Sequence, residues 1–195
     1  MATLLWMQTG ACGGESLALL SAESPGLEGL LAGHGVELLW HPSLSHQPMR
    51  EHERMIERIL EGRQTLDILC VEGSIVTAPR GSGHFDRYRG RAKMDWVRDL
   101  AQHAGAVVAM GTCAAFGGLH AAPPNPGDCI GLQFDKDRPG GLLPPAWRSR
   151  RGLPVINVAG CPAHPHAMTQ TLAWLASGLP LRLDALNRPA AHFST

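Results

Sequence analysis

The amino-acid sequence predicts an α/β protein built on one doubly wound parallel sheet. Short, continuously apolar runs recur along the 195 residues, and such runs are typical of parallel strands that are covered on both faces. Amphipathic stretches with helical spacing lie between these runs. Several runs end in a glycine-containing turn that leads toward the next helical stretch. This alternation of strands and helices is the pattern of a doubly wound fold.

Five apolar runs are predicted as strands. They are short and rich in Val, Leu or Ile, and they read as strands because they are continuous rather than alternating. The five runs cover residues 3–7, 36–40, 66–71, 106–110 and 155–158.

Three segments between these runs are predicted as helices. Residues 48–60 place Met55, Ile56 and Ile59 on one face and Arg and Glu on the other. Residues 91–103 and 167–176 carry similar apolar stripes. Together with the five runs, these helices predict a flavodoxin-like sheet.

Length and composition indicate one domain with a short extension. Residues 1–180 are expected to form the flavodoxin-like domain, and residues 181–195 an extended C-terminal tail. Two long segments, 77–91 and 123–145, are rich in Gly and Pro and break the rhythm. Loops of that length are usually functional or bind a partner, although they can also be solvated surface.

Charge and cysteine content exclude several classes of protein. The 17 basic and 17 acidic residues balance, so nothing suggests binding to nucleic acid or to an anionic membrane. Five cysteines at wide spacing do not suggest a disulfide framework. No apolar stretch approaches the roughly 20 residues of a membrane span. A cytoplasmic location is expected, provided that Met1 is the natural N-terminus.

Three cysteines share one local pattern. Cys12, Cys113 and Cys161 each follow an apolar run, and each sits in a turn that contains glycine. In an open α/β sheet the carboxyl ends of the strands form one edge, where ligands bind. The three thiols are therefore expected to converge there, as an iron–sulfur cluster or a soft metal would require.

A fourth ligand is less evident from the sequence. A four-iron cube needs four ligands, and Glu15 occupies the position of a second cysteine in the turn Cys12-Gly13-Gly14-Glu15. A carboxylate is a harder ligand than a thiolate. The alternatives are another side chain, a three-iron cluster on three thiolates, or no cluster. The candidate side chains for that fourth position are Asp86, Cys129, Glu72 and His84.

The turns around these cysteines supply further expected contacts with a cluster. Glycine allows close approach of the backbone, whose N–H groups can then reach sulfide. Cys70, in the middle of a predicted strand, is instead expected to be a core residue. The expected contact residues are Gly13, Gly14, Glu72, Gly111, Thr112, Gly160 and Pro162.

The motifs, taken in order, resemble those of one family: the small, electron-transferring subunit of [NiFe]-hydrogenases. The resemblance extends over nearly the whole chain. The matching segments are WMQ at 6–8 followed by Cys12, VEGSI at 71–75, GTCAAFGG at 111–118, AAPPNP at 121–126 and NVAGCPAHP at 157–165.

The resemblance implies a flavodoxin-like domain that carries the proximal iron–sulfur cluster. Cys12, Cys113 and Cys161 match three of its four ligands, and Glu15 stands at the fourth cysteine's position. Actinobacterial-type members also lack that cysteine, and aspartate ligation among them favours a carboxylate without choosing between Glu15 and Asp86. One cluster is implied, [4Fe–4S] or alternatively [3Fe–4S].

The resemblance also implies a partner and a function. The nickel–iron centre, and with it every catalytic residue for the oxidation, production or sensing of H2, would lie on a large subunit that forms a heterodimer with this chain. The cluster would relay electrons to an acceptor protein or further redox subunit. Most relatives continue into a domain with two more clusters, so this chain would be a short form or a fragment.

Two other functions remain open. The chain could be a cluster-free assembly or scaffold protein that keeps the fold, which the missing fourth cysteine suggests. Less favoured is a nucleotide-binding protein, in which the glycine-rich turn after the first strand cradles a phosphate.

Overall fold

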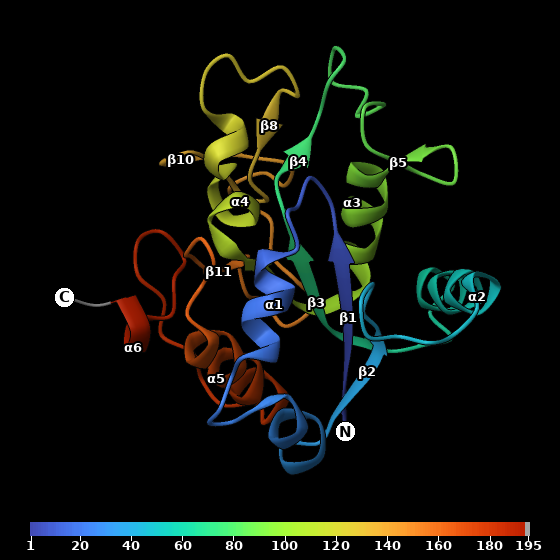
Figure 1. The fold of residues 1–195 in the computed structure, drawn as a ribbon, viewed down its shortest axis with the longest axis vertical. Helices are drawn as coiled ribbons and strands as arrows, with labels where there is room; N and C mark the ends of the chain where they lie inside the picture. Colours follow the sequence, from blue (N-terminus) through green and yellow to red (C-terminus); the bar gives the residue numbers. More distant parts are fainter. Residues whose placement is uncertain (194–195) are drawn as a thin grey trace.

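A five-stranded parallel sheet forms the centre of the computed structural model, which describes residues 1–193. Its strands lie in the order β11-β7-β3-β1-β2 (Figure 1). This is the strand order of flavodoxin-like folds, with the topological switch point between β1 and β3. The predicted fold class is therefore confirmed. The bounds of the strands are β1 (Ala2–Gln8), β2 (Val36–Trp40), β3 (Leu66–Glu72), β7 (Ala104–Met110) and β11 (Ile156–Val158).

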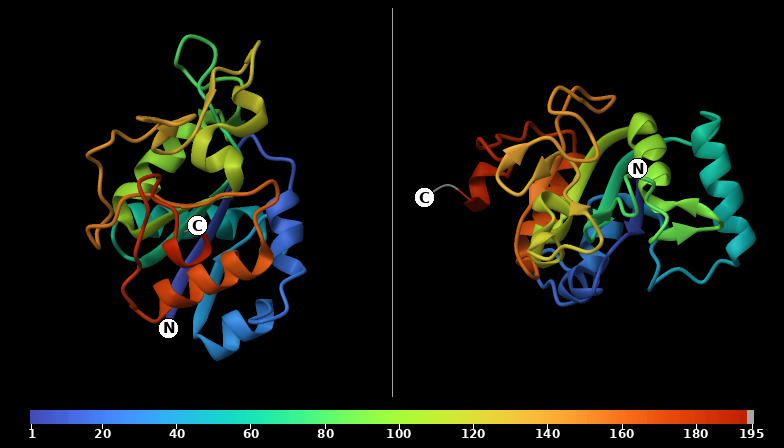
Figure 2. Two further views of the ribbon diagram at one scale, coloured as in Figure 1. Left: turned by 90° about the vertical axis from the view of Figure 1, so that its left-hand side faces the viewer. Right: turned by 90° about the horizontal axis from the view of Figure 1, so that it is seen from above.

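Helices cover both faces of the sheet. One face packs against α1 (Gly14–Leu20) and α5 (Pro165–Ala176), and the other against α2 (Met49–Leu60) and α3 (Lys93–His103). Viewed from above, the two pairs lie on opposite sides of the strands (Figure 2). The sheet therefore separates two apolar cores, as the continuously apolar strands require.

The alternation of side chains along β1 divides these cores. Leu4 and Trp6 point toward α1 and α5, whereas Leu5 and Met7 point toward α2 and α3. In the pairing of β1 with β3, Trp6 lies beside Cys70. Cys70 is fully buried, as expected for a core residue, and burial raises the pKa of its thiol well above the usual range.

The two long segments and the residues beside them contain short paired strands that the sequence did not reveal. Residues 91–92 were expected to begin a helix, but they form a strand that pairs with Arg87–Tyr88, and α3 starts at Lys93. Strands of two residues are too short for a period to be visible. The pairs are β4 (Ile75–Val76) with β8 (Cys129–Ile130), β5 (Arg87–Tyr88) with β6 (Arg91–Ala92), and β9 (Phe134–Asp135) with β10 (Arg138–Pro139).

The remaining elements are short helical segments. One lies between α1 and β2, two follow each other between β7 and β8, and the fourth lies near the C-terminus. They are η1 (Gly29–Gly33), α4 (Gly111–Phe116), η2 (Gly118–Ala121) and α6 (Ala190–Phe193). None of the helices within residues 1–193 combines the length and apolar character needed to cross a membrane.

The C-terminal segment differs from the extended tail that was expected. It turns back at a bridge between Leu183 and Pro189 and ends in α6. Backbone and side chain of buried Asn157 donate hydrogen bonds to the carbonyls of Asn187 and Leu186, both at 2.8 Å. The described part of the segment is therefore packed on β11 by hydrogen bonds. Residues 194–195 of the predicted tail lie outside the described residues.

Candidate metal centre

The structure brings the three strand-end cysteines together. Cys12 follows β1, Cys113 lies in the first turn of α4 after β7, and Cys161 follows β11. Burial raises the pKa of the Cys113 thiol, and hydrogen bonding with Ser74 and the Leu119 backbone opposes this rise. The negative charges of Cys161 and Cys12 add to the rise. Both Cys12 and Cys161 are therefore close enough to Cys113 for their charges to act on it.

The Cys113 and Cys161 turns are bound directly to each other. The Thr112 N–H donates to the Gly160 carbonyl at 2.8 Å, and the Gly160 N–H donates to the Thr112 hydroxyl at 3.0 Å. Gly160 has φ +148°, and a Cβ there would collide with the backbone of Ala163. Thr112 and Gly160 thus fix the spacing of two of the cysteines.

The turn that carries Cys12 lies next to the turn that carries Cys161. A Cβ on Gly14 would lie 3.2 Å from Cys12 Sγ and 4.0 Å from Cβ of Pro162. Gly13, at φ +80°, adopts the left-handed conformation that favours glycine. Cys12 and Cys161 are both exposed, and Cys113 is half-buried. Two of the three thiols are therefore open to solvent or to a partner.

Glu15 joins the three turns through its carboxylate. The side chain leaves the first turn of α1 and is buried, with 9% of the residue exposed. Its Oε2 accepts a hydrogen bond from the Ala163 N–H at 2.8 Å, and its Oε1 lies against Gly111. Burial raises the pKa of Glu15, the Ala163 bond opposes this, and the charge of Glu72 adds to the rise.

Glu72 holds the backbone of this same turn. It ends β3, is 1% exposed, and accepts hydrogen bonds through both carboxylate oxygens. Oε1 accepts from two backbone amides and Oε2 from three side chains. These donors are the N–H groups of Glu15 at 3.2 Å and Ser16 at 3.4 Å, Trp6 Nε1 at 2.9 Å, Gln8 Nε2 at 3.0 Å and Ser16 Oγ at 2.7 Å.

A buried histidine extends the network and was missed by sequence reasoning. His41 is fully buried, and its Nε2 lies 3.3 Å from Ser16 Oγ. Its Nδ1 accepts a hydrogen bond from the Ser43 N–H at 3.1 Å. Nε2 therefore carries the proton and donates to Ser16, whose hydroxyl donates to Glu72. Burial lowers the pKa of His41, and the negative charge of Glu72 partly opposes this effect. No local pattern around position 41 indicates this role.

The alternative fourth ligands lie in different surroundings. Asp86 is bound to Lys93 at 2.8 Å, and His84 is exposed in the 77–91 segment. Cys129 is buried on β8, and burial raises the pKa of its thiol, with further contributions from the charges of Asp128, Cys113 and Asp86. Cys129 is thus placed near Cys113.

The donor atoms at this edge are thiol sulfur and carboxylate oxygen. Within residues 1–193 no group of three or more His, Cys, Asp or Glu side chains is arranged to hold one metal ion. In a four-iron cube each thiolate binds a different iron, so the ligands are spaced around the cube. Three cysteine sulfurs and one carboxylate oxygen form a donor set that iron accepts.

The chain is similar in sequence to one known family and to several curated proteins. The family model of the NADH ubiquinone oxidoreductase 20 kDa subunit matches residues 12–175. Hydrogenase-2 small chain of Escherichia coli K12 is 32% identical, over 95% of this chain and 46% of that protein. The F420 non-reducing hydrogenase II small subunit of Methanosarcina mazei is also 32% identical, over 97% and 54%. The chain thus spans about half the length of these relatives.

Two solved structures with a similar fold come from hydrogenases. The actinobacterial-type NiFe-hydrogenase from Ralstonia eutropha H16 has a chain that is similar with a TM-score of 0.83 and 32% identity, over 97% of this chain and 58% of that chain. A Ni-Fe-Se hydrogenase from Desulfomicrobium baculatum follows at a TM-score of 0.76 and 27% identity, over 97% and 70%.

Proposed function

Because this chain belongs to the family of the NADH ubiquinone oxidoreductase 20 kDa subunit, we propose that it is an electron-transfer subunit that holds one iron–sulfur cluster. The observation that carries the proposal is the convergence of Cys12, Cys113 and Cys161 at the carboxyl edge of one sheet. The similarity to hydrogenase small subunits supports the narrower proposal that the chain works in a [NiFe]-hydrogenase. A cluster bound here would accept and release single electrons.

The fourth ligand in this proposal is Glu15, and the cluster is of the [4Fe–4S] type. Glu15 is the candidate whose carboxylate lies between the Cys113 and Cys161 turns, with Oε1 not engaged by Ala163. Asp86 lies in the 77–91 segment and binds Lys93 through Oδ1, although its buried Oδ2 has no hydrogen-bond partner among the described residues. Glu72 is held by five donors. A [3Fe–4S] cluster on the three thiols is the alternative.

The roles of the other residues follow from their contacts. Glu72 and Ser16 fix the turn that presents Cys12 and Glu15, and the Thr112–Gly160 pair fixes Cys113 relative to Cys161. Ser74, whose hydroxyl donates to the Gly117 carbonyl at 2.8 Å, and the Leu119 backbone lie beside Cys113 and oppose the rise of its pKa. Hydrogen bonds to a ligating sulfur lower its electron donation and so tune the potential.

The proposed partner is a large subunit that carries the nickel–iron centre. Two of the three thiols are exposed, so a partner that docks on this edge would bury the cluster and receive or deliver electrons across a short gap. A second protein or redox subunit would serve as electron acceptor. A cytoplasmic location and a domain boundary at residue 180 stay predictions.

Hydrogen-driven reduction tests this function. The chain is purified anaerobically from its native host with whatever large subunit accompanies it, and the complex is exposed to H2. We expect a nickel-containing partner and an electron paramagnetic resonance signal that changes within one turnover under H2 but not under N2. A complex that holds iron on this chain but never responds to H2 would contradict the hydrogenase assignment, and a chain without iron would favour the scaffold.

A further inference from the structure

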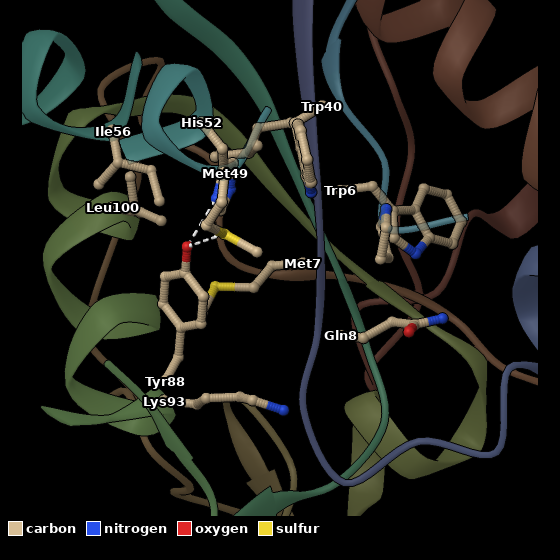
Figure 3. A pocket seen from close by; sticks show the side chains of 12 residues that line it. Trp6, Met7, Gln8, Trp40, Met49, His52, Ile56, Tyr88, Lys93 and Leu100 are labelled. Atoms are coloured by element: carbon tan, nitrogen blue, oxygen red, sulfur yellow. Dashed lines mark hydrogen bonds between the residues drawn. The ribbon is translucent and has the colours of Figure 1, made fainter. Parts of the chain in front are cut away.

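A cavity on the other face of β1 takes no part in the proposed metal centre. Its volume is about 280 Å³, near the lower end of small-molecule sites. It lies between α2, the β5–β6 hairpin and β1, with Met7 on its floor (Figure 3). Trp6 and Gln8 point to the opposite side of β1, where they hold Glu72 (Figure 3).

One wall of the cavity is a chain of flat rings. Trp40 and His52 are 4.2 Å apart between ring centroids, and His52 and Tyr88 meet edge to face at 5.6 Å. The Tyr88 hydroxyl lies 3.0 Å from His52 Nδ1 and donates to Met49 Sδ at 2.8 Å (Figure 3). These contacts hold the rings in place before any ligand arrives, which lowers the entropy cost of binding.

The polar groups of the cavity are few and specific. Burial lowers the pKa of His52 to about 4, so His52 is neutral at neutral pH. Lys93 therefore supplies the cation, and one of its three N–H donors is bound to Asp86 at 2.8 Å. The Lys93–Asp86 pair has no net charge, so the free Lys93 donors suit an uncharged acceptor oxygen better than a full anion.

We propose that this cavity binds a planar aromatic carbonyl compound. The ring would lie on Met7 and against the Trp40–His52–Tyr88 wall, where aromatic and sulfur contacts favour flat π-systems. The carbonyl oxygen would accept a hydrogen bond from Lys93. The site goes beyond the proposed function and does not depend on it, because none of the cysteines lines the cavity.

A fluorescent aromatic ketone, 6-propionyl-2-dimethylaminonaphthalene, tests the site in the purified full chain. We expect saturable binding at one site, and weak competition from 2-ethylnaphthalene, which has a similar ring and no oxygen. Lys93→Met should weaken binding of the ketone about tenfold, the effect of losing a hydrogen bond from a charged donor. Lys136→Met removes the chain's other lysine, on an exposed turn, and should change nothing.

A second variant guards against misfolding of the first. Met49 lines the mouth of the cavity and is 53% exposed, so Met49→Trp should fold normally and block binding. Equal affinities of the Lys93→Met and Lys136→Met variants would overturn the proposal, as would unchanged binding to Met49→Trp or the absence of a saturable site. Equal affinity for the ketone and 2-ethylnaphthalene would indicate an apolar occupant instead.

Discussion

Replacing Glu72 by alanine is expected to destabilise the chain by about 4 kcal/mol, because several buried donors lose their acceptor at once. The Trp6 indole, the Gln8 amide and the Ser16 hydroxyl all donate to this carboxylate. Water cannot replace it readily at a position that is 1% exposed. Urea unfolding of the metal-free chain, monitored by circular dichroism, measures the loss.

Two further variants separate this explanation from a general effect of removing charge. Glu57→Gln removes a carboxylate on the exposed face of α2 and should cost less than about 0.5 kcal/mol. Glu72→Gln keeps the shape of the side chain but presents an amide N–H to the donors. Its loss of stability should therefore lie between those of Glu72→Ala and Glu57→Gln. If Glu72→Ala unfolds at the same urea concentration as Glu57→Gln, the carboxylate does not hold the turn.

Replacing Glu15 by cysteine is expected to change the cluster without removing it. A thiolate is softer than a carboxylate and donates more charge to iron, so the reduction potential should shift on the order of 100 mV and the electron paramagnetic resonance spectrum should change with it. Anaerobic redox titration of the purified chain measures both. The iron content should stay constant, because the variant supplies a fourth thiolate at the same position.

Asp86→Ala is the matched control for Glu15→Cys. Asp86 was an alternative ligand, but its carboxylate is bound to Lys93, so its removal should leave the spectrum and the potential unchanged. A spectrum that is unaltered in Glu15→Cys and altered in Asp86→Ala would transfer the ligand role to Asp86. An unaltered spectrum in both would exclude Glu15 and Asp86, and would leave Cys129, His84 or a three-iron cluster on three thiolates.

The sheet could be predicted because its signal is local. Runs such as 66–71 are continuously apolar, and the strand order confirms the flavodoxin-like fold. The position of Cys12, Cys113 and Cys161 at one edge follows from the same pattern, since parallel strands end on the same side. Helix and strand bounds differ from the expected ones by a few residues, as at Lys93, where a two-residue strand precedes α3.

The polar contacts could not be predicted in the same way. The expected contact of Glu72 with a cluster stays a prediction, and the hydrogen bonds that Glu72 accepts in the structure come from donors 56 to 66 residues away in sequence. His41 reaches this network only because β2 ends beside α1, and no spacing of residues announces it. The cavity, likewise, arises from how α2 and the β5–β6 hairpin meet β1.

Iron and acid-labile sulfide, counted per chain after anaerobic purification, test the central claim most directly. If Cys12, Cys113, Cys161 and Glu15 hold a cube, the count should be about four of each, and changing any one of the three cysteines to serine should lower it sharply. Less than about one iron per chain, with sulfide absent, would mean that the three thiols meet at this edge for some other purpose.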